Sequence, residues 1–469
     1  MSAPLLWVVL PIGMGGAFLL VWQERWLVRI GTLSALGLAL LAWWLPIDEP
    51  FAIGSLALKV DGTLQVLGRA FTLEPAHRSV LAMLYGLAAM WFFGSATLGL
   101  ARRVIPLGMS ILGLMVAMLA VRPFLYAAVF LGIAVLLSVP MLLPFTQRPG
   151  RGVVRYVIFH TLVIPFLLFA GWLFAGIEAS PGDVELTVRA TAIFVLGFAF
   201  LLSIFPLYTW IPMALEESSP YTVGFLLWLL PQATALFGMG FLDQYAFLRL
   251  SENLPALMRF AGLVMVVTAG VYASFENHAA RLMGYGIIAE TGFFLLTLSL
   301  GAPAGVHLIS LQILPRGLGV TIWAFSLAIL QKAAPDLRLT TLQGKGRAWP
   351  WVTLGIGFAN LSLAGLPLLA GFPPRLLLLE QLAVNRSLGD ALWLAIGLLG
   401  LISGAVRTLG SLVLPGESAG WKRSERVQEV ILIGLGIWML IGLGLFPQLS
   451  LFIFNDLSAL FERLGQGML

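Results

Sequence analysis

The stretch FPLYTWIPMALEESSPYTVGF (Phe205–Phe225) interrupts an apolar region of the sequence and decides how the chain is organised. Pro206 and Pro212 stand six residues apart, and Glu216 and Glu217 follow shortly after them. A proline inside a helix removes a backbone hydrogen bond. A helix broken inside a bilayer needs side chains, water or neighbouring helices to satisfy the freed backbone groups. The stretch therefore predicts a broken helix next to a polar part of the molecule.

The composition of the rest of the chain identifies its solvent as a lipid bilayer. The 469 residues are 59% hydrophobic and 10% charged, whereas soluble domains carry about 25% charged residues. Apolar runs of about 20 residues recur along the chain, each long enough to cross a membrane. Because every spanning backbone group must be hydrogen-bonded, we expect an all-α polytopic membrane protein. The first run lacks a basic region and a small-residue cleavage site, and we interpret it as a span and not a signal peptide.

Two absences narrow the possible functions. The sequence contains no cysteine, which excludes disulfides, thiolate metal sites and iron–sulfur ligation by this chain. No basic run is interleaved with aromatic residues, so nucleic acid is not an expected partner. We expect no metal site and no cofactor.

The apolar runs predict about 14 membrane spans. Their expected limits are 4–22, 29–46, 79–100, 104–121, 124–145, 153–177, 188–212, 222–242, 255–275, 280–301, 304–331, 349–372, 390–414 and 428–453. We divide the chain into N-terminal helices (1–121), a first five-helix repeat (104–242), a second five-helix repeat (255–414) and a C-terminal helix (428–469). An alternating pattern around Asp61-Gly62 predicts an extramembrane hairpin near 51–73.

A second proline-rich span points to an internal repeat. LSLAGLPLLAGFPPR (Leu361–Arg375) contains Pro367, Pro373 and Pro374, five spans after the first break. A repeated unit of five helices is inverted in its second copy, and inverted repeats with broken helices are typical of transporters. The alternative is that proline is simply common in membrane helices. Lysine and arginine are more frequent in the connections after odd-numbered spans, which predicts that both termini lie on the outer side of the membrane.

Four segments resemble one family. FPLYTWIPMALEESSPYTV, RLMGYGIIAETGF (Arg281–Phe293), the LSLAGLPLLAGFPPR segment and FLGIAVLLSVP (Phe130–Pro140) occur in the order and at the spacing found in antiporter-like membrane subunits. These subunits occur in respiratory complex I (NADH:quinone oxidoreductase), membrane-bound hydrogenases and Mrp-type cation/proton antiporters. The resemblance implies half-channels joined by a line of buried ionisable residues, whose charges depend on burial and on their neighbours.

The chain departs from this family in its first repeat. The family's glutamate of the fifth span falls on Ala134, and the lysine of the seventh span falls on Leu201. The basic residue of the eighth span falls on Gln232, and a histidine of the proline motif falls on Tyr208. We therefore expect the first half of the relay to be lost and largely dry.

The second repeat keeps ionisable residues at the matching positions. Arg316 and Arg375 fall where the family has lysines, and Glu290 falls where it often has a histidine. Arginine stays protonated in almost any environment, so it suits a fixed charge or a gate better than a proton carrier. Because a charge in the membrane needs a partner, we expect Glu290 and Arg316, on consecutive spans, to pair.

Each candidate site residue has a competing interpretation. Glu290 is either a relay group or a protonated carboxyl that packs two helices, and Arg316 either transports or pairs structurally. Arg375 either belongs to the relay or extends from a span end towards the membrane surface. His160 is either a relay group or a packing residue, and Glu216 is either a half-channel carboxylate or a solvated loop residue.

The resemblance implies a proton-translocating, antiporter-like subunit of a complex I-like or hydrogenase-like energy-converting complex. The alternatives are a structural or docking subunit that no longer moves ions, and an Mrp-type antiporter subunit. The expected partners are other membrane subunits, the lipid bilayer and protons, with sodium as an alternative ion. No segment of the sequence predicts a redox module, so any redox chemistry is expected in partner chains. The expected location is the bacterial inner or cytoplasmic membrane.

Overall fold

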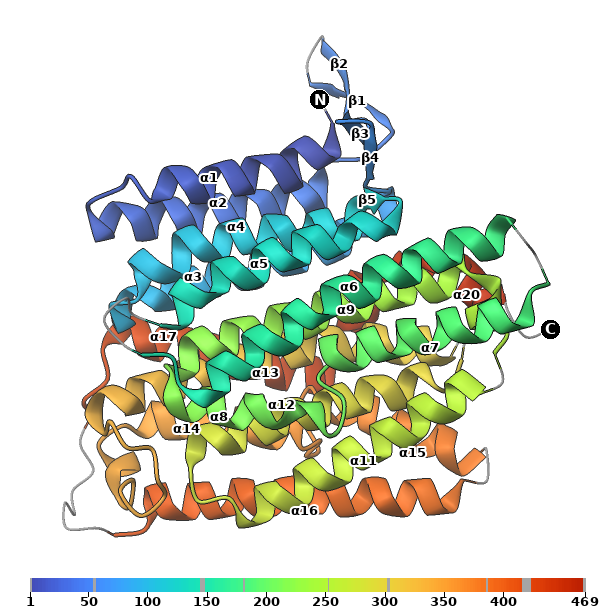
Figure 1. Ribbon diagram of the computed structural model, residues 1–469. Helices are drawn as coiled ribbons and strands as arrows, with labels where there is room; N and C mark the ends of the chain where they lie inside the picture. The colour runs from blue at the N-terminus through green and yellow to red at the C-terminus, as the bar shows by residue number, and fades with distance from the viewer. Residues whose placement is uncertain are drawn as a thin grey trace.

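The chain folds into a bundle of long helices with a small β region at one end (Figure 1). The computed structural model describes residues 2–53, 56–143, 148–179, 182–251, 253–301, 304–384, 387–415 and 423–466. Within these residues, 12 helices are long and apolar enough to cross a membrane. The chain is therefore an integral membrane protein of the all-α class, as predicted.

The elements follow one another along the chain with short connections. The helices are α1 (Leu10–Phe18), α2 (Glu24–Trp44), α3 (Arg78–Leu98), α4 (Ala101–Ala120), α5 (Ala127–Leu142), α6 (Arg151–Ala179), α7 (Val184–Leu201), α8 (Trp210–Glu217), α9 (Pro220–Gln244), α10 (Ala246–Arg249), α11 (Asn253–Phe275), α12 (Ala279–Leu298), α13 (Ala304–Ala333), α14 (Pro350–Leu363), α15 (Phe372–Val384), α16 (Leu388–Val413), α17 (Val427–Leu445), α18 (Gln448–Ile453), α19 (Leu457–Leu460) and α20 (Glu462–Gln466). The strands are β1 (Pro50–Ile53), β2 (Leu56–Lys59), β3 (Thr63–Val66), β4 (Arg69–Thr72) and β5 (Val121–Arg122).

Each of the predicted spans coincides with a helix or with a helix broken in two. The 12 long helices account for all of them except the first, which is the short apolar segment Leu5–Phe18, and the twelfth, which contains α14. The exact number of spans stays a prediction, because length and composition alone identify the candidates.

The β region differs from the single extramembrane hairpin that the sequence predicts. Two antiparallel hairpins, β1–β2 and β3–β4, follow each other, and β5 joins the edge of β4. The second turn lies at Leu67-Gly68, where both residues have positive φ, as a two-residue turn between twisted strands requires. Asp61-Gly62 instead connects the hairpins, and the Gly62 amide donates to Oδ1 of Asp48 at 2.9 Å. Residues 54–55 of the predicted hairpin and residues 467–469 of the predicted C-terminal helix lie outside the described residues.

Both predicted breaks are present, a few residues earlier than their prolines suggested. The first interruption separates α7 from α8, with a single 3₁₀ turn at Leu207–Thr209, and Pro212 lies inside α8. The second separates α14 from α15, and Pro373 and Pro374 lie in the first turn of α15, where proline is tolerated.

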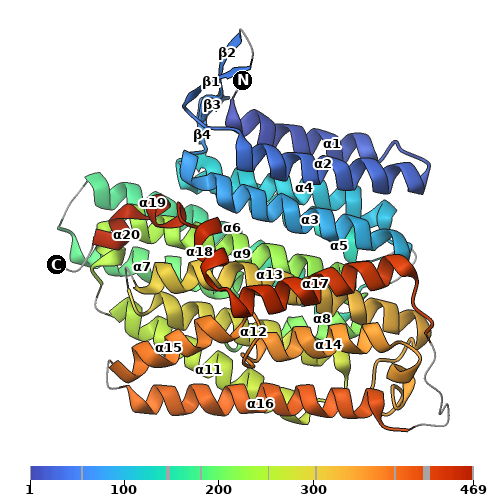
Figure 2. The ribbon, with the colours of Figure 1, turned by 180° about the vertical axis from the view of Figure 1, so that it is seen from behind.

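The two broken helices run in opposite directions across the bundle. In Figures 1 and 2, α7 and α15 lie at the end of the bundle that carries the β strands, and α8 and α14 lie at the opposite end. We call the first of these the hairpin end. This arrangement supports inverted repeats, although the repeat boundaries stay a prediction.

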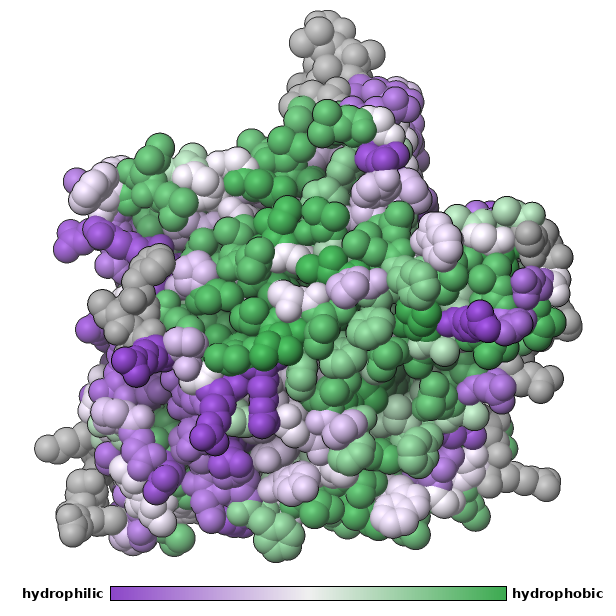
Figure 3. Space-filling model, viewed as in Figure 1, coloured by the Kyte–Doolittle hydropathy of each residue, from purple (hydrophilic) through white to green (hydrophobic). Residues whose placement is uncertain are grey.

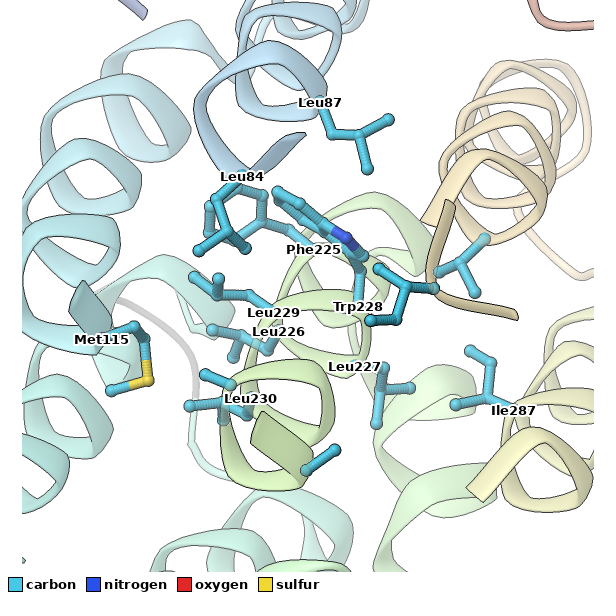
Figure 4. Close-up of a cluster of buried hydrophobic side chains, with 14 of the residues drawn as sticks. Leu84, Leu87, Met115, Phe225, Leu226, Leu227, Trp228, Leu229, Leu230 and Ile287 are labelled. Carbon is cyan, nitrogen blue, oxygen red and sulfur yellow. The ribbon is translucent and has the colours of Figure 1, made fainter. Parts of the chain in front are cut away.

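Three helices form the core of the bundle. Almost every residue of α12 and α13 is buried, and α9 is buried over most of its length. A helix that is apolar all round belongs in the interior. Figure 4 shows Phe225 to Leu230 of α9 packed among Leu84 and Leu87 of α3, Met115 of α4 and Ile287 of α12. The outer helices instead expose apolar side chains, which cover much of the surface in Figure 3 as a bilayer requires.

Candidate functional site

An ion pair is buried where the second broken helix meets α12. Glu290 is 1% exposed and Arg375 is 3% exposed, and Nη2 of Arg375 donates to Oε1 of Glu290. The same Nη2 lies 3.1 Å from the carbonyl oxygen of Leu363. The guanidinium also lies over the ring of Phe293, 4.4 Å from its centroid, a favourable cation–π geometry.

The helix break places Arg375 at this position. Because α14 ends at Leu363, its last carbonyl groups have no helical partner, and one of them becomes the acceptor for Arg375. Gly365 has φ +78°, and a Cβ there would lie 3.1 Å from Cγ of Arg375. Glycine therefore supplies the left-handed conformation and also leaves room for the arginine stem. Oγ of Ser362 accepts from the amide of Gly371 at 3.2 Å, which satisfies a further backbone group of the break.

A close contact between α11 and α12 fixes the position of Glu290 from the other side. A Cβ on Gly292 would lie 2.8 Å from the carbonyl oxygen of Gly262, and a Cβ on Gly262 would lie 2.7 Å from that of Gly292. Only paired small residues allow two membrane helices to approach this closely. Glu290 is two residues from this crossing, so its backbone has little freedom to move.

Helix α13 adds two polar side chains to the site. Nε2 of Gln312 lies 3.4 Å from Oε2 of Glu290, and Nη2 of Arg316 lies 3.3 Å from Oγ1 of Thr291. The expectation that Glu290 pairs with Arg316 is wrong, because Arg375 forms the ion pair. The physical reason is that the break lets Arg375 approach the carboxylate, whereas Arg316 reaches the neighbouring residue.

Gln312 and Thr291 were not predicted as site residues. Gln312 lies four residues before Arg316, so it occupies the same face of one helix. This four-residue spacing could have identified Gln312 from the sequence, because an amide side chain beside a charge is unusual in a membrane helix.

The site carries an excess of positive charge. Glu290 supplies one negative charge, and Arg316 and Arg375 supply two positive charges. Among the described residues, Arg316 forms no ion pair, and the Nε atoms of both arginines are buried without a hydrogen-bond partner. Unpaired buried donors are costly, so this cluster is polar but incompletely satisfied by the chain itself.

The corresponding positions of the first repeat are mostly apolar. Ala134 and Leu201 are buried among hydrophobic side chains, and Tyr208 is also buried. Gln232 of α9 follows shortly after the apolar cluster of Figure 4. Its Oε1 and the Oγ1 of Thr234 are buried without a hydrogen-bond partner in the described part of the chain.

His160 lies in a second polar cluster, inside the first repeat. Its Nδ1 donates to the carbonyl oxygen of Tyr156 at 2.9 Å, and its ring packs against Tyr156 and Trp210. The Tyr156 hydroxyl lies 2.8 Å from Oγ of Ser138, one turn after Ala134. Nε1 of Trp210 donates to Oγ of Ser203, at the α7 break, at 2.8 Å. These contacts hold the His160 ring among neutral polar groups.

Glu216 lies far from the other site residues, at the end of the bundle opposite the hairpins (Figure 1). Its carboxylate forms an ion pair with Nη1 of Arg281 at 3.6 Å, and Arg281 also pairs with Glu276. Glu217 is more tightly held, because its Oε2 accepts from the amide of Gly152 at 2.7 Å. The structure thus joins Glu290 and Arg375 directly and brings Arg316 to the next residue, while Glu216, His160 and Gln232 lie apart.

Comparisons with known proteins agree with this architecture. Residues 173–403 match the family model described as "NADH:quinone oxidoreductase/Mrp antiporter, TM". "NADH-quinone oxidoreductase subunit 14" of Thermus thermophilus is 31% identical over 356 residues, which are 74% of each chain. A chain of the membrane-bound sulfane sulfur reductase, an archaeal respiratory membrane complex, matches over 99% of both chains with a TM-score of 0.82 and 16% identity. A chain of the Mrp complex from Dietzia sp. matches over 99% of both chains with a TM-score of 0.79 and 15% identity. The chain therefore belongs to the NADH:quinone oxidoreductase/Mrp antiporter family of membrane subunits.

Proposed function

We propose that this chain is a proton-translocating, antiporter-like membrane subunit of a complex I-like or hydrogenase-like energy-converting complex. The observation that carries this proposal is the buried ion pair between Glu290 and Arg375 at a helix break, with Arg316 one helix away. Ionisable groups at this depth are expensive, and in membrane proteins they mark ion pathways. Because the two arginines stay protonated, Glu290 is the group of this cluster that can gain or lose a proton.

The chemistry of the site assigns different roles to its charged groups. Both arginines stay charged, so they act as fixed positive charges that favour the carboxylate form of Glu290. Protonation of Glu290 neutralises it and releases Arg375 from the ion pair. The freed positive charge then acts on neighbouring groups through a poorly screened interior. In this mechanism Glu290 is the switch and the arginines transmit its state.

The first repeat serves a different purpose. Because Ala134 and Leu201 cannot be charged, and because apolar packing surrounds them, proton relay through their positions is lost. The neutral cluster around Tyr156 and Trp210 supports a structural role for the first break. Gln232 is an exception to the prediction that the first repeat contains little water. Its Oε1 is buried without a hydrogen-bond partner among the described residues, which favours a nearby water molecule.

The proposal includes the chain's surroundings. Its neighbours are other membrane subunits packed against its flanks, and the Thermus relative and the neighbours of known structure support this, since they come from multi-subunit complexes. Both termini lie on the outer side of a bacterial inner membrane, and the transported ion is a proton, with sodium as the alternative.

Proton pumping by the assembled complex in proteoliposomes tests the proposal. Glu290→Gln and Arg375→Ala should lower the number of protons moved per turnover or impair assembly, whereas Gln232→Ala should change neither by more than about twofold. The proposal fails if Gln232→Ala abolishes pumping while the other two variants pump normally.

The same measurement separates the main alternative, a structural or docking subunit. The excess of non-titrating arginines is the observation that favours this alternative. A docking subunit would lose assembly in the Glu290 variant, but fully assembled complexes would keep their normal pumping ratio. An Mrp-type function would instead appear as sodium-dependent proton exchange without any redox substrate.

A further inference from the structure

A groove lies along the seam between the two repeats. Its walls come from α7 and α9 of the first repeat and from α11 and α12 of the second, and its lining is almost entirely apolar. A second cavity continues it towards the hairpin end, and the two share Leu242, Leu254, Met258 and Leu298. The groove opens at the surface beside Leu257, whose side chain is half exposed. In the view of Figures 1 and 3, α7 and α11 lie on the near, apolar side of the bundle.

The length of the groove matches one leaflet of a bilayer. Along α9 its lining extends from Thr234 to Leu242, two residues before the end of the helix at Gln244. Eight residues of helix rise about 12 Å, which is most of one leaflet of a hydrocarbon core about 30 Å thick. The groove therefore begins near the middle of the membrane and ends at the level of the lipid headgroups.

The width of the groove suits a single hydrocarbon chain. The groove is narrow, with a cavity volume of about 70 Å³. A helix is about 10 Å wide, so a helix from a neighbouring subunit is too large to enter the groove. A single acyl chain is thin enough to lie along it, with its outer side in the bilayer.

A cation lies at the mouth of the groove. Arg249, in α10, is the charged residue among those that line the outer cavity. Its Nη1 donates to the carbonyl oxygens of Leu242, at 3.4 Å, and Asp243, so the exposed end of α9 fixes the guanidinium. Its remaining N–H groups form no hydrogen bond within the described residues, and the residue is partly exposed. The nearby Asp243 carboxylate accepts from the Leu464 amide at 2.7 Å, and within the described residues it forms no ion pair with Arg249.

We propose that this groove binds a phospholipid of the leaflet at the hairpin end, with one acyl chain along the seam and its phosphate on Arg249. An apolar channel of leaflet length favours the acyl chain. A fixed guanidinium with free N–H groups recognises a phosphate diester. The two features lie at the two ends of one continuous cavity, as they do in a phospholipid.

The bound chain would seal the seam behind the ion pair. Phe294, one turn after Glu290, lines the groove, and so does Thr234, whose Oγ1 is buried without a hydrogen-bond partner in the described residues. An empty groove would bring water to within one helical turn of the buried carboxylate. The lipid chain would therefore keep water from reaching the interior of the bundle through the groove.

Photo-crosslinking of the full-length chain in lipid nanodiscs tests this site. The probes are phosphatidylglycerol and phosphatidylethanolamine with a diazirine at the end of one acyl chain. Labelling is expected on the segments 234–242 and 254–261. Ala261→Phe, which fills the groove, should reduce this labelling at least tenfold, whereas Ala256→Phe, on the exposed face of the same helix, should not. Leu257→Trp at the opening replaces Ala261→Phe if that variant does not fold.

Native mass spectrometry of the detergent-purified protein tests the headgroup. One phospholipid should remain bound, and Arg249→Gln should reduce its retention several-fold, while Arg189→Gln at the same end should not. Equal loss of both lipids in Arg249→Gln indicates recognition of the shared phosphate, and loss of phosphatidylglycerol alone indicates recognition of net charge. Equal labelling in Ala261→Phe and Ala256→Phe would mean ordinary surrounding lipid and would overturn the proposal. Crosslinks confined to residues outside the segments 234–242 and 254–261, or the retention of no lipid, would also overturn it.

Discussion

The unequal charges of the Glu290 site predict a definite order of stability among three single variants. Glu290→Gln keeps the shape of the side chain but removes the one carboxylate, and so leaves two buried arginines without a counter-charge. Arg375→Met removes one partner of the ion pair, and Arg316→Met removes the arginine that forms no ion pair in the described residues. We expect Arg316→Met to be the mildest and Glu290→Gln the most damaging.

The magnitudes follow from the contacts. Removing one partner of a buried ion pair typically costs about 3–5 kcal/mol, and Glu290→Gln should lie at or above this range. Arg375→Met also frees the Leu363 carbonyl, but Glu290 can turn towards Arg316, which already contacts the next residue. We therefore expect a smaller loss of about 1–3 kcal/mol. Arg316→Met loses one hydrogen bond and an uncompensated charge, so the change should lie within about 1 kcal/mol of zero.

Unfolding of the full-length chain in mixed micelles, with increasing SDS and tryptophan fluorescence as the signal, measures this order. The chain has 15 tryptophans, and circular dichroism supplies a second signal. A difference of about 1.4 kcal/mol is tenfold in the equilibrium constant, so the extreme variants should differ by roughly two orders of magnitude or more. If Arg316→Met were as damaging as Glu290→Gln, the second arginine would have its own counter-charge and the reasoning would be wrong.

Three further predictions test the surroundings of the site. Gly292→Val should lower the free energy of unfolding by about 1–3 kcal/mol, because the larger side chain forces α11 away from α12. Gly389→Ala, where a Cβ meets open space, should have little effect. Equal SDS midpoints for the two variants would refute the close contact. Tyr156→Phe should lower the free energy of unfolding by about 1 kcal/mol, because the contact with Ser138 is lost. It should leave the number of protons pumped per turnover unchanged, and a lower number would instead place the His160 cluster in a relay. Burial lowers the pKa of His278, which precedes α12. The contribution of neutral His278 to stability is therefore complete above about pH 6.5 and declines as the pH falls through the lowered pKa. His278→Gln should flatten the pH dependence of the SDS midpoint below about pH 6.5, and an unchanged slope would contradict this.

The fold was largely accessible from the sequence because a membrane restricts the choices. Apolar runs can only be helices in lipid, and prolines recurring five spans apart located both interruptions. The β region was less predictable. Asp61-Gly62 has the composition of a hairpin turn, but the Asp48 carboxylate holds the Gly62 amide between the two hairpins, and the actual turn contains Leu67, which composition disfavours in that conformation.

The candidate site was predictable in its residues but not in its pairing. Glu290, Arg316 and Arg375 stand out because ionisable residues are rare in membrane spans. The partner of Glu290 depends on where α14 ends, and residue type alone places that end only to within a few positions. Span order favoured Arg316 on the next helix, whereas the break moved Arg375 from a later helix into contact.

The two helix breaks are stabilised by different side chains, which supports the proposal that the two predicted repeats differ in function. In the first break, Ser203 has a positive φ and its hydroxyl accepts from Nε1 of Trp210, so two neutral side chains pair across the interruption. In the second, the Leu363 carbonyl accepts from Arg375, which also holds Glu290. A break frees backbone acceptors, and the side chains that pack at the break decide whether a charge can be kept there. Arg375 places a fixed cation beside a carboxylate, and Trp210 cannot.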